Sequence, residues 1–364
     1  MASKSLHPIP FDSFTDPEAR LRRRSTDLLV HPDQMQNLRL RTAVIKALRA
    51  RLDAEGFLEV ETPILHTVHG GASARPFRTY INAYGEDLTL RIAPELYLKR
   101  LVVGGSGPVY ELGRDFRNEG ADATHNPEFT VLEAYRPYAD YVQMRELTER
   151  LIKDAAQAVF GSVSLPLGRK ASSGRVVRDV SGPWRVVSVC DALSEALGRR
   201  VDVQTDFEEL LALAQQHGVR VHEGMGPGAI VEELYGELVE AHTVEPTFYT
   251  DFPAETSPLA APHRSVPGLA ERWDLVINGM EMGCAYSELA DPLVQRERLT
   301  EQSLKAASGD LEAMEVDEDF LYALETGMPP TGGLGLGVDR LVMLLAQTQI
   351  RGVLSFPFVK PERS

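Results

Sequence analysis

Residues 116–135, FRNEGADATHNPEFTVLEAY, constrain the fold of this chain more than any other segment. One strand pattern ends near Arg117 and Glu119, a turn-rich loop follows, and a second strand pattern begins at Glu128. Consecutive strands joined by a loop without a crossover helix predict an antiparallel pair over about residues 111–136. The segment also offers a cation for phosphate, an aromatic face for a base and carboxylates for a cationic ligand.

The remaining patterns mix strands and helices without the regular alternation that a doubly wound fold requires. We expect strands over residues 57–63, 77–82, 88–92, 111–118, 128–136, 248–252, 273–279, 280–288 and 332–338. We expect helices over residues 33–55, 93–102, 141–160, 311–326 and 339–348, with a helical insertion at about residues 186–243. Residues 1–30 predict an irregular N-terminal arm, and residues 163–185 predict loops. Hairpin-joined strands with helices on one side indicate an α+β fold, an antiparallel sheet flanked by helices.

The charge balance limits how this chain could hold nucleic acid. Its 38 Lys and Arg residues against 53 Asp and Glu residues give a formal net charge of −15 at pH 7. Nucleic-acid affinity is dominated by phosphate contacts, which usually come from a basic stripe. The dense basic run is residues 20–24, RLRRR. We interpret it first as a helix flank paired with acids such as Glu18 and Asp27, and second as a phosphate contact.

Several classes of protein do not match this composition. The chain has no run of about 18 apolar residues that could span a membrane, and its N-terminus lacks the apolar core of a signal peptide. Its two cysteines, Cys190 and Cys284, are too few for a disulfide framework or a cysteine-built metal site. We therefore expect a reduced, cytoplasmic setting.

Residues 332–340, GGLGLGVDR, combine alternating glycines with a basic residue at the start of a helix. The segment lacks the Lys-Ser/Thr ending of a P-loop and lies near the C-terminus. Alternating glycines in a strand allow a flat ligand or another backbone to approach closely, although tight packing alone is the alternative. Arg340 is then placed to contact phosphate or to stack on a base.

Three segments in this order resemble the signature motifs of class II aminoacyl-tRNA synthetases: residues 57–63, 116–133 and 333–340. The intervening segments GGASARPF (70–77), RIAPELYLKR (91–100) and MEMGCAYSEL (280–289) resemble the lysine enzymes in particular. The resemblance runs from about Thr15 to Pro361. It implies a class II synthetase-like sheet with a helical insertion, a catalytic domain over residues 31–364, and a homodimer formed through the first motif.

The resemblance also implies ATP and Mg²⁺ as cofactors. Arg117 would hold the α-phosphate and Arg340 the γ-phosphate, and these two are the expected catalytic residues. The expected ATP-binding residues are Arg117, Glu119, His125, Asn126, Phe129, Glu281 and Arg340. Phe129 would stack on adenine. Asp274 and Glu281 would bind Mg²⁺, an ion that prefers carboxylate oxygens. Taken alone, Asp274 would more often be an exposed or salt-bridged acid, and His125 a satisfied loop histidine.

The implied substrate pocket needs carboxylates at both ends, because lysine brings two ammonium groups. Glu95 would bind the α-amino group, and Glu288 with Tyr135 or Tyr286 would bind the ε-ammonium group. The expected substrate-binding residues are Gly71, Glu95, Glu133, Tyr135, Cys284, Tyr286 and Glu288. The alternative for Glu133 and Glu288 is structural ion pairing with Arg136 or Arg91. Such a site rejects ligands without the distal amine, whereas ornithine and β-lysine are harder to exclude.

Two features depart from the lysine enzymes. Only about thirty residues precede the catalytic helix, which is too few for the anticodon-binding OB-fold of those enzymes, so we expect no such domain in this chain. Cys284 stands where the family commonly has Asn, so the preference among diamino acids stays open.

The sequence therefore predicts a ligase that activates L-lysine, or a close diamino acid, with ATP and transfers it to an acceptor. The acceptor stays open among a tRNA 3′ end, a protein amine and a small-molecule amine. Similar precedents are the elongation factor P–lysine ligases and the synthetase-like part of actinobacterial proteins that transfer lysine to phosphatidylglycerol. The alternatives are a genuine lysine–tRNA ligase acting through the acceptor end, and a non-catalytic paralogue that senses lysine or tRNA. An enzyme is favoured over a sensor because the phosphate-binding and metal-binding residues are all present: Arg117, Glu119, Asp274, Glu281 and Arg340.

Overall fold

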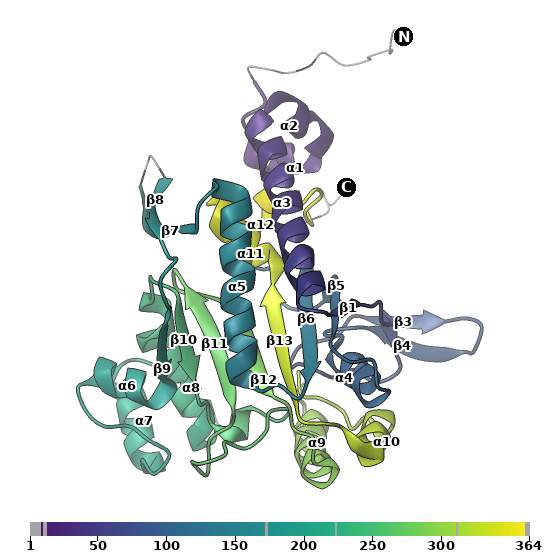
Figure 1. Cartoon of the computed structure of the whole chain (residues 1–364), viewed down its shortest axis with the longest axis vertical. Helices are drawn as coiled ribbons and strands as arrows, with labels where there is room; N and C mark the ends of the chain where they lie inside the picture. Colours follow the sequence, from purple (N-terminus) through teal and green to yellow (C-terminus); the bar gives the residue numbers. More distant parts are fainter. Residues whose placement is uncertain (1–8, 10–12, 172–173, 223, 311, 361–364) are drawn as a thin grey trace.

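A central sheet of eight strands carries the fold, in the spatial order β1-β5-β6-β13-β12-β11-β10-β9 (Figure 1). The computed structural model describes residues 9, 13–171, 174–222, 224–310 and 312–360. The strands are β1 (Leu58–Glu59), β5 (Val109–Phe116), β6 (Glu128–Pro137), β9 (Arg185–Ser188), β10 (Thr247–Thr250), β11 (Arg272–Ile277), β12 (Met280–Ser287) and β13 (Thr331–Gly337). Neighbours from β5 to β10 run antiparallel, and the edge strands β1 and β9 pair parallel. The expected α+β sheet is confirmed, with two parallel edges.

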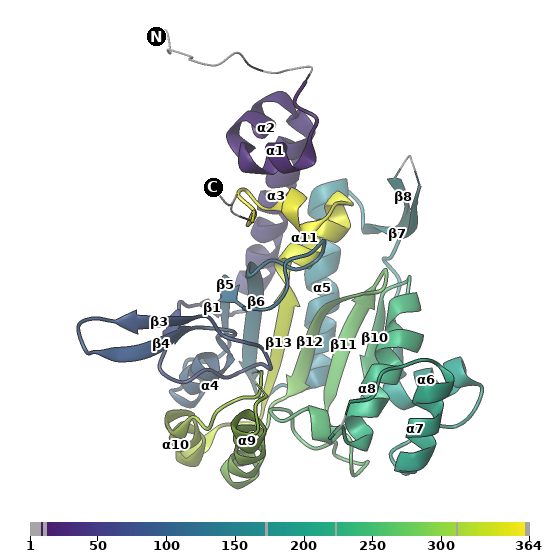
Figure 2. The same ribbon diagram turned by 180° about the vertical axis from the view of Figure 1, so that it is seen from behind.

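Three helices cover one face of this sheet, α3 (Pro32–Ala54), α5 (Tyr141–Phe160) and α11 (Val338–Ala346) (Figure 1). Their apolar sides pack on inward side chains of the strands and form the main core, which includes the fully buried Leu48, Leu151 and Leu336. Seen from behind, the strands β13, β12 and β11 have no described helix in front of them (Figure 2). The three covering helices α3, α5 and α11 therefore lie on the opposite side of these strands (Figure 1 and Figure 2).

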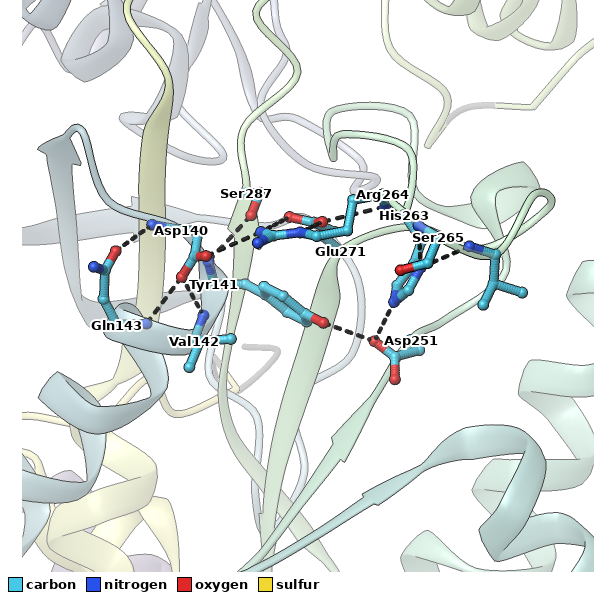
Figure 3. A network of polar contacts seen from close by, with 11 residues as sticks. Asp140, Tyr141, Val142, Gln143, Asp251, His263, Arg264, Ser265, Glu271 and Ser287 are labelled. Carbon is cyan, nitrogen blue, oxygen red and sulfur yellow. Dashed lines mark hydrogen bonds and ion pairs between the residues drawn. The ribbon is translucent and has the colours of Figure 1, made fainter.

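A polar network fixes the start of α5 next to the strand ends (Figure 3). The Asp140 carboxylate accepts hydrogen bonds from the backbone N–H groups of Val142 and Gln143, at 3.0 and 3.2 Å. Gln143 Oε1 accepts in return from the Asp140 backbone N–H at 2.8 Å, which completes a capping box. Arg264 Nη2 joins Asp140 and Glu271 at 2.9 and 2.8 Å. The network thus ties α5 to the segment that leads into β11.

The expected helical insertion consists of three helices, α6 (Val189–Leu197), α7 (Phe207–Gln216) and α8 (Pro227–Leu238), which share a second core with β10 and β11. Leu193, Leu213 and Leu234 are buried in that second core. The other helices of the described chain are α1 (Pro17–Arg22), α2 (Arg24–Val30), α4 (Glu95–Val103), α9 (Pro292–Ala307), α10 (Glu318–Gly327) and α12 (Ile350–Val353), with 3₁₀ turns at Glu240–His242 and Ala254–Thr256. None of the described helices combines the length and the apolar character that crossing a membrane would need.

The predicted irregular arm over residues 1–30 is wrong for the part that the structure describes, because α1 and α2 occupy most of residues 17–30. Residues 1–8 and 10–12 lie outside the described residues. Asp16 caps α1 by accepting a hydrogen bond from the Ala19 backbone N–H at 2.7 Å, and Pro17 suits the first helical position. Local capping therefore makes a helix where the composition suggested loop.

The basic run at residues 20–24 is paired with acids, as our first interpretation held. Arg22 contacts Glu18 at 2.7 Å, and Arg20 contacts Asp27 at 2.6 Å. Arg24 is buried and lies 2.5 Å from the second oxygen of Asp27. These arginines brace the N-terminal helices rather than forming an open cationic stripe.

The predicted loops over residues 163–185 contain a hairpin, β7 (Ser164–Ala171) with β8 (Gly174–Asp179). Leu165 and Leu167 anchor it because both side chains are buried in the main core. A smaller sheet consists of β2 (Leu65–His66), β4 (Glu86–Leu90) and β3 (Arg78–Ile81). The strand expected at 57–63 is only the two residues of β1.

Two helices near the C-terminal half differ from expectation. The helix α9 was not predicted, although Asp291 caps it and Pro292 opens it. The helix expected at residues 311–326 begins instead at Glu318, because the Asp317 side chain accepts from the Phe320 backbone N–H at 2.9 Å and so caps it. Leu311 lies outside the described residues.

Candidate active site

The open face of the sheet brings together residues from four neighbouring strands. Across the sheet, Glu133 on β6 is paired with Gly335 on β13, Gly335 with Cys284 on β12, and Cys284 with Asp274 on β11. A second row two residues away contains Tyr135, Gly333, Tyr286 and Arg272 in the same order. Residues two apart on a strand point to the same face, so both rows line one surface.

The glycines of β13 form the floor of this surface. A Cβ on Gly333 would collide with Glu288 Oε1 and would lie 2.5 Å from Tyr135 Cε1. The alternate residues Leu334 and Leu336 are buried in the main core on the other face. The leucines of β13 therefore pack into the main core on one face of the sheet, whereas its glycines leave the other face without side chains.

Two buried carboxylates approach each other beside this floor. Glu95 lies on the first turn of α4, and Glu288 follows β12. Both surround Lys99, whose Nζ lies 2.6 Å from Glu95 Oε1 and forms an ion pair with Glu288 Oε2. Burial raises the pKa of Glu288 to about 8, although Lys99 opposes the shift. Burial also raises the pKa of Glu95, again against the effect of Lys99.

Glu133 is a third buried carboxylate of this group. Its Oε2 accepts a hydrogen bond from the Tyr135 hydroxyl at 3.0 Å. Burial, followed by repulsion from Asp115 and Glu95, raises the pKa of Glu133 well above its usual value. Glu95, Glu133 and Glu288 therefore form an acidic pocket that favours a cationic ligand.

Gly71 closes the pocket near Glu95. Its φ of +86° lies in the left-handed region, and a Cβ there would lie 3.1 Å from Glu95 Cβ. Glycine is required for both reasons, so its backbone lies against the α4 end of the pocket. Cys284 lies in the middle of the floor, with Sγ 3.5 Å from the Tyr286 hydroxyl. Burial, with Glu281 and Asp274 adding to it, raises the pKa of the Cys284 thiol, so the thiol is not activated.

Arg117 and Phe129 face each other at the far end of β5 and β6. The guanidinium carbon of Arg117 lies 5.2 Å from the centroid of the Phe129 ring. Arg117 Nε is buried and has no hydrogen-bond partner among the described residues. A buried guanidinium N–H without a partner is costly, so the geometry leaves a donor ready for an anionic ligand. Glu119 lies nearby on the surface and accepts from the Arg75 backbone N–H at 3.2 Å.

The loop between β5 and β6 reaches α11 through His125. The Nδ1 of His125 lies 3.0 Å from an Asp122 carboxylate oxygen, and its Nε2 lies 3.4 Å from Arg340 Nη2. Asn126 Oδ1 accepts from the Phe358 backbone N–H at 3.3 Å. The expected nucleotide residues of the loop are thus held next to Arg340 by the C-terminal segment.

Arg340 lies in the first turn of α11, and its side chain reaches β12. Its Nη1 donates to the Glu281 carbonyl oxygen at 2.8 Å and lies 3.4 Å from Glu281 Oε2. The neighbouring Asp339 is buried and accepts from the Thr130 backbone N–H at 2.8 Å. Arg340 therefore lies at the same end of the sheet as Arg117, where both could meet one phosphate chain.

The expected magnesium ligands fit that ion only in combination with a ligand that brings its own oxygens. Glu281 is partly exposed, whereas both oxygens of Asp274 contact Arg272, at 3.1 and 2.9 Å. Burial raises the pKa of Asp274 to about 7, with Arg272 opposing and Glu281 adding to the shift. No group of three or more His, Cys, Asp or Glu side chains in the described structure could hold a metal ion alone. Mg²⁺ commonly uses one or two carboxylates plus substrate phosphates, so the pair remains a suitable donor set.

The two arginines considered as partners of Glu133 and Glu288 pair with other acids instead. Arg136 contacts Glu55 at 3.1 Å. Arg91 is fully buried and contacts Glu111 at 2.6 Å and Asp115 at 3.1 Å. Neither arginine pairs with Glu133 or Glu288 in the described structure, which leaves both acids in the pocket.

Sequence reasoning missed three residues of this surface, Lys99, Asp115 and Arg272. Lys99 follows Glu95 by four residues on α4, and Arg272 precedes Asp274 by two on β11, so spacing alone could have paired each with its acid. Burial raises the pKa of Asp115 to about 7, while Arg91 and Arg117 oppose the shift. The carboxyl group of Asp115 contributes to the raised pKa of Glu133.

A separate cavity of about 740 Å³ contains none of the expected site residues. It lies between α1, α2, the loop at Ala123 and Thr124, and the end of α11. Arg20 and Arg24, which line it, already pair with Asp27. The candidate active site is the open sheet face, not this cavity.

Comparisons with known proteins show the family to which this chain belongs. The profile of the family described as tRNA synthetases class II (D, K and N) matches residues 16–360. The chain is 55% identical over 364 residues to the lysylphosphatidylglycerol biosynthesis bifunctional protein LysX of Nocardia farcinica, covering 99% of this chain and 32% of that protein. It is 55% identical over 365 residues to the protein of the same name from Mycobacterium marinum (99% and 33%), and 53% identical over 366 residues to that from Rhodococcus opacus (100% and 33%). The chain spans about a third of the length of these curated relatives.

Proposed function

The chain belongs to the tRNA synthetases of class II (D, K and N), and from that premise we propose that it activates L-lysine, or a close diamino acid, with ATP. The product would be an aminoacyl-adenylate, and the aminoacyl group would then pass to an acceptor. We further propose residues 31–364 as the catalytic domain, a homodimer formed through β1 and its preceding helix, and a cytoplasmic location.

The observation that carries the proposal is the trio of buried carboxylates, Glu95, Glu133 and Glu288. Within this family the amino acid can be aspartate, asparagine or lysine by the family description. An aspartate side chain would bring a second anion into an acidic pocket, and asparagine would leave buried carboxylates without a counter-charge. A diamino acid supplies two ammonium donors, so lysine suits this pocket best.

The residues of the chain account for adenylate formation by positioning. The attacking carboxylate is already ionised at pH 7 and needs no general base. Arg117 would hold the α-phosphate and Arg340 the γ-phosphate, with adenine stacked on Phe129 and the remaining nucleotide contacts from Glu119, His125 and Asn126. Fixed cations next to the phosphates neutralise the charge that develops as pyrophosphate leaves.

Glu281 and Asp274 would hold Mg²⁺, and the Asp274 carboxylate would also keep its contact with Arg272. When bound, the ion would neutralise phosphate charge and help to orient the phosphate chain. On the amino-acid side, Glu95 would bind the α-amino group beside Gly71. Glu288, Tyr135 and Tyr286 would surround the ε-ammonium group, with Glu133 adjacent and Cys284 on the floor.

The acceptor stays open in this proposal. The names of the relatives connect those much longer proteins with lysylphosphatidylglycerol biosynthesis. Acceptors compatible with an adenylate are a tRNA 3′ end, a protein amine and a small-molecule amine. Incubation with labelled lysine, ATP and cell extract would assign the label to one of these classes.

Lysine-dependent exchange of pyrophosphate into ATP tests the activation step. Purified protein with Mg²⁺ should exchange label with lysine and not with aspartate or asparagine. Arg117→Ala should lower the exchange rate by about 100-fold or more, because a fixed cation at the reacting phosphate is lost. The matched control is Arg114→Ala, whose exposed side chain pairs with Glu128 at 3.1 Å and should leave the rate within about threefold.

Two outcomes would count against the proposal. Exchange with aspartate or asparagine but not lysine would refute the lysine assignment. Lysine binding without any exchange across lysine, ornithine and β-lysine would favour the sensor instead.

A further inference from the structure

One buried cation of the pocket has no role in the reaction as proposed above. The Lys99 side chain is fully buried between Glu95, at 2.6 Å, and Glu288, with which it forms an ion pair. Glu95 lies one turn earlier on the same helix, whereas Glu288 comes from the end of β12. Lys99 therefore joins the two carboxylates that would bind the two ends of a diamino acid.

Glu288 keeps one acceptor free despite this ion pair. Its Oε1 is buried and has no hydrogen-bond partner in the part of the chain that the structure describes. The same oxygen lies against Gly333, where a Cβ would collide with it. A buried carboxylate oxygen without a donor is costly, so the site is incomplete until a donor arrives on the glycine side.

We propose that Lys99 is a positioning residue whose ammonium group favours the ionised forms of Glu95 and Glu288 and aims the free oxygen of Glu288 at the distal ammonium group of the substrate. The inference rests on the proposed function, because it names a residue that acts through the same pocket. Lys99 itself would not contact the reacting carboxylate or the phosphates.

Among the described residues, Lys99 is the cation that pairs with these two acids. In the described structure, no other Lys or Arg pairs with Glu95 or Glu288. The groups that face them are Glu133 and Tyr135 from β6 and Tyr286 from β12, while α10 contributes the Phe320 ring, 5.9 Å from Lys99 Nζ. Burial raises the pKa of both acids and Lys99 opposes the rise in each case.

The charge balance of the pocket supports the same conclusion. In the complex with substrate, with Glu95, Glu133 and Glu288 ionised, the ammonium group of Lys99 leaves two negative charges for the ligand to offset. A diamino acid brings two ammonium groups, which would neutralise that remainder. Without Lys99, the neighbouring acids would repel each other and take up protons at higher pH.

The test is the pH dependence of the KM for lysine in pyrophosphate exchange, measured between pH 6 and 8.5. Lys99→Met should raise the KM for lysine about 100-fold at pH 6.5, and should shift its pH profile upward by about two units. The KM for ATP should stay within about threefold, since the cation acts only on the amino-acid side. A purely structural role would instead change both KM values together, without a shift along the pH axis.

A charge-conserving variant separates the charge of Lys99 from its geometry. Lys99→Arg should keep the pH profile of the wild type but raise the KM for lysine about tenfold, because a planar guanidinium cannot replace a compact ammonium group between two carboxylates. Arg100→Met on the same helix is the matched control. Its side chain lies over Tyr97, 5.0 Å from the ring centroid, and its loss should leave the KM for lysine unchanged.

An unshifted pH profile in Lys99→Met would overturn the inference while leaving the proposed function intact. If Lys99→Met does not fold, Lys99→Arg decides, because a wild-type KM for lysine in that variant would contradict the positioning role. If the wild type shows no lysine-dependent exchange, the proposed function fails first and this inference fails with it.

Discussion

At the scale of single residues, the candidate site depends on acids whose ionisation is set by their surroundings. Glu288 is the clearest case, since its side chain is fully buried and its pKa is raised to about 8. A neutral carboxyl group can donate or accept, whereas its ionised form binds an ammonium group strongly. The protonation of Glu288 should therefore be coupled to substrate binding.

Lysine binding at pH 7 should release about one proton per site, because a group with a pKa of about 8 is mostly protonated in the free protein. The bound ammonium group favours the ionised carboxylate and expels that proton. Proton release should therefore decrease as the pH rises above 8, and affinity should weaken as the pH falls. Calorimetric titrations in buffers of different ionisation enthalpy would count the protons.

Glu288→Gln should remove this proton release and weaken lysine binding, whereas Glu86→Gln at an exposed position of β4 should change neither. Tight lysine binding at pH 7 without proton release would show that Glu288 is already ionised in the free protein. Proton release that persists in Glu288→Gln would assign it to another acid of the pocket.

The sequence located most of these residues but not the contacts that set their charge. Glu95, Glu133 and Glu288 follow from the resemblance, whereas Lys99 at four residues from Glu95 predicts an ordinary exposed pair on a helix. Its burial depends on Phe320 of α10, more than 200 residues away in the chain. Long-range packing of this kind is not contained in local spacing.

At the scale of elements, β13 presents apolar side chains on one face of the sheet and glycine backbone on the other. The side chains of Leu334 and Leu336 fill the core, and the glycines between them leave the other face open. The sequence predicted this strand and its open approach, because glycine at every second position leaves one face of an extended strand without side chains. What the pattern could not supply is which side chains use the space.

Gly333→Ala should raise the KM for lysine about tenfold or more, because its Cβ would displace Glu288 and Tyr135 from their places above β13. The effect on the KM for ATP should be smaller, since the clash is on the amino-acid side. Gly335→Ala is the matched control on the same strand, where a Cβ would meet only Cys284 Sγ, at 4.0 Å. Steady-state exchange kinetics and thermal unfolding of both variants would test this expectation.

Equal losses in the two alanine variants would mean that β13 tolerates no side chain at all, and that Glu288 has no special relation to Gly333. A loss of thermal stability in Gly333→Ala with an unchanged KM for lysine would assign the glycine to packing alone.

Two elements escaped prediction for physical reasons. The helix α9 is rich in polar residues and buries only Gln295 and Leu299, so its apolar periodicity is weak. The hairpin of β7 and β8 lies between loops and is anchored by Leu165 and Leu167 in a core that other elements supply. In contrast, α5 was predicted at its correct bounds, and in the structure Asp140 caps its N-terminus.

At the scale of the whole molecule, the two ends of the described chain brace the end of the candidate site that contains His125 and Arg340. Arg24 donates hydrogen bonds to the carbonyl oxygens of Leu354 and Ser355, both at 3.2 Å, and pairs with the buried Asp27. Just before that C-terminal segment, the Ile350 backbone N–H donates to the Ala123 carbonyl oxygen at 3.0 Å. The loop that carries His125 is thus connected to α2 through the C-terminal segment.

Arg24→Ala should lower the free energy of unfolding by about 3 kcal/mol, because it leaves a buried carboxylate with one fewer cation and frees two carbonyl oxygens. It should also raise the KM for ATP more than the KM for lysine, because the loosened C-terminal segment holds the loop next to Arg340 rather than the acidic pocket. Urea unfolding and exchange kinetics would measure both. Arg23→Ala, at an exposed neighbouring position, is the control and should change neither. An equal rise of both KM values would show that the N-terminal helices support the whole sheet. An unchanged KM for ATP in a destabilised variant would contradict the proposed connection between α2 and the loop that carries His125.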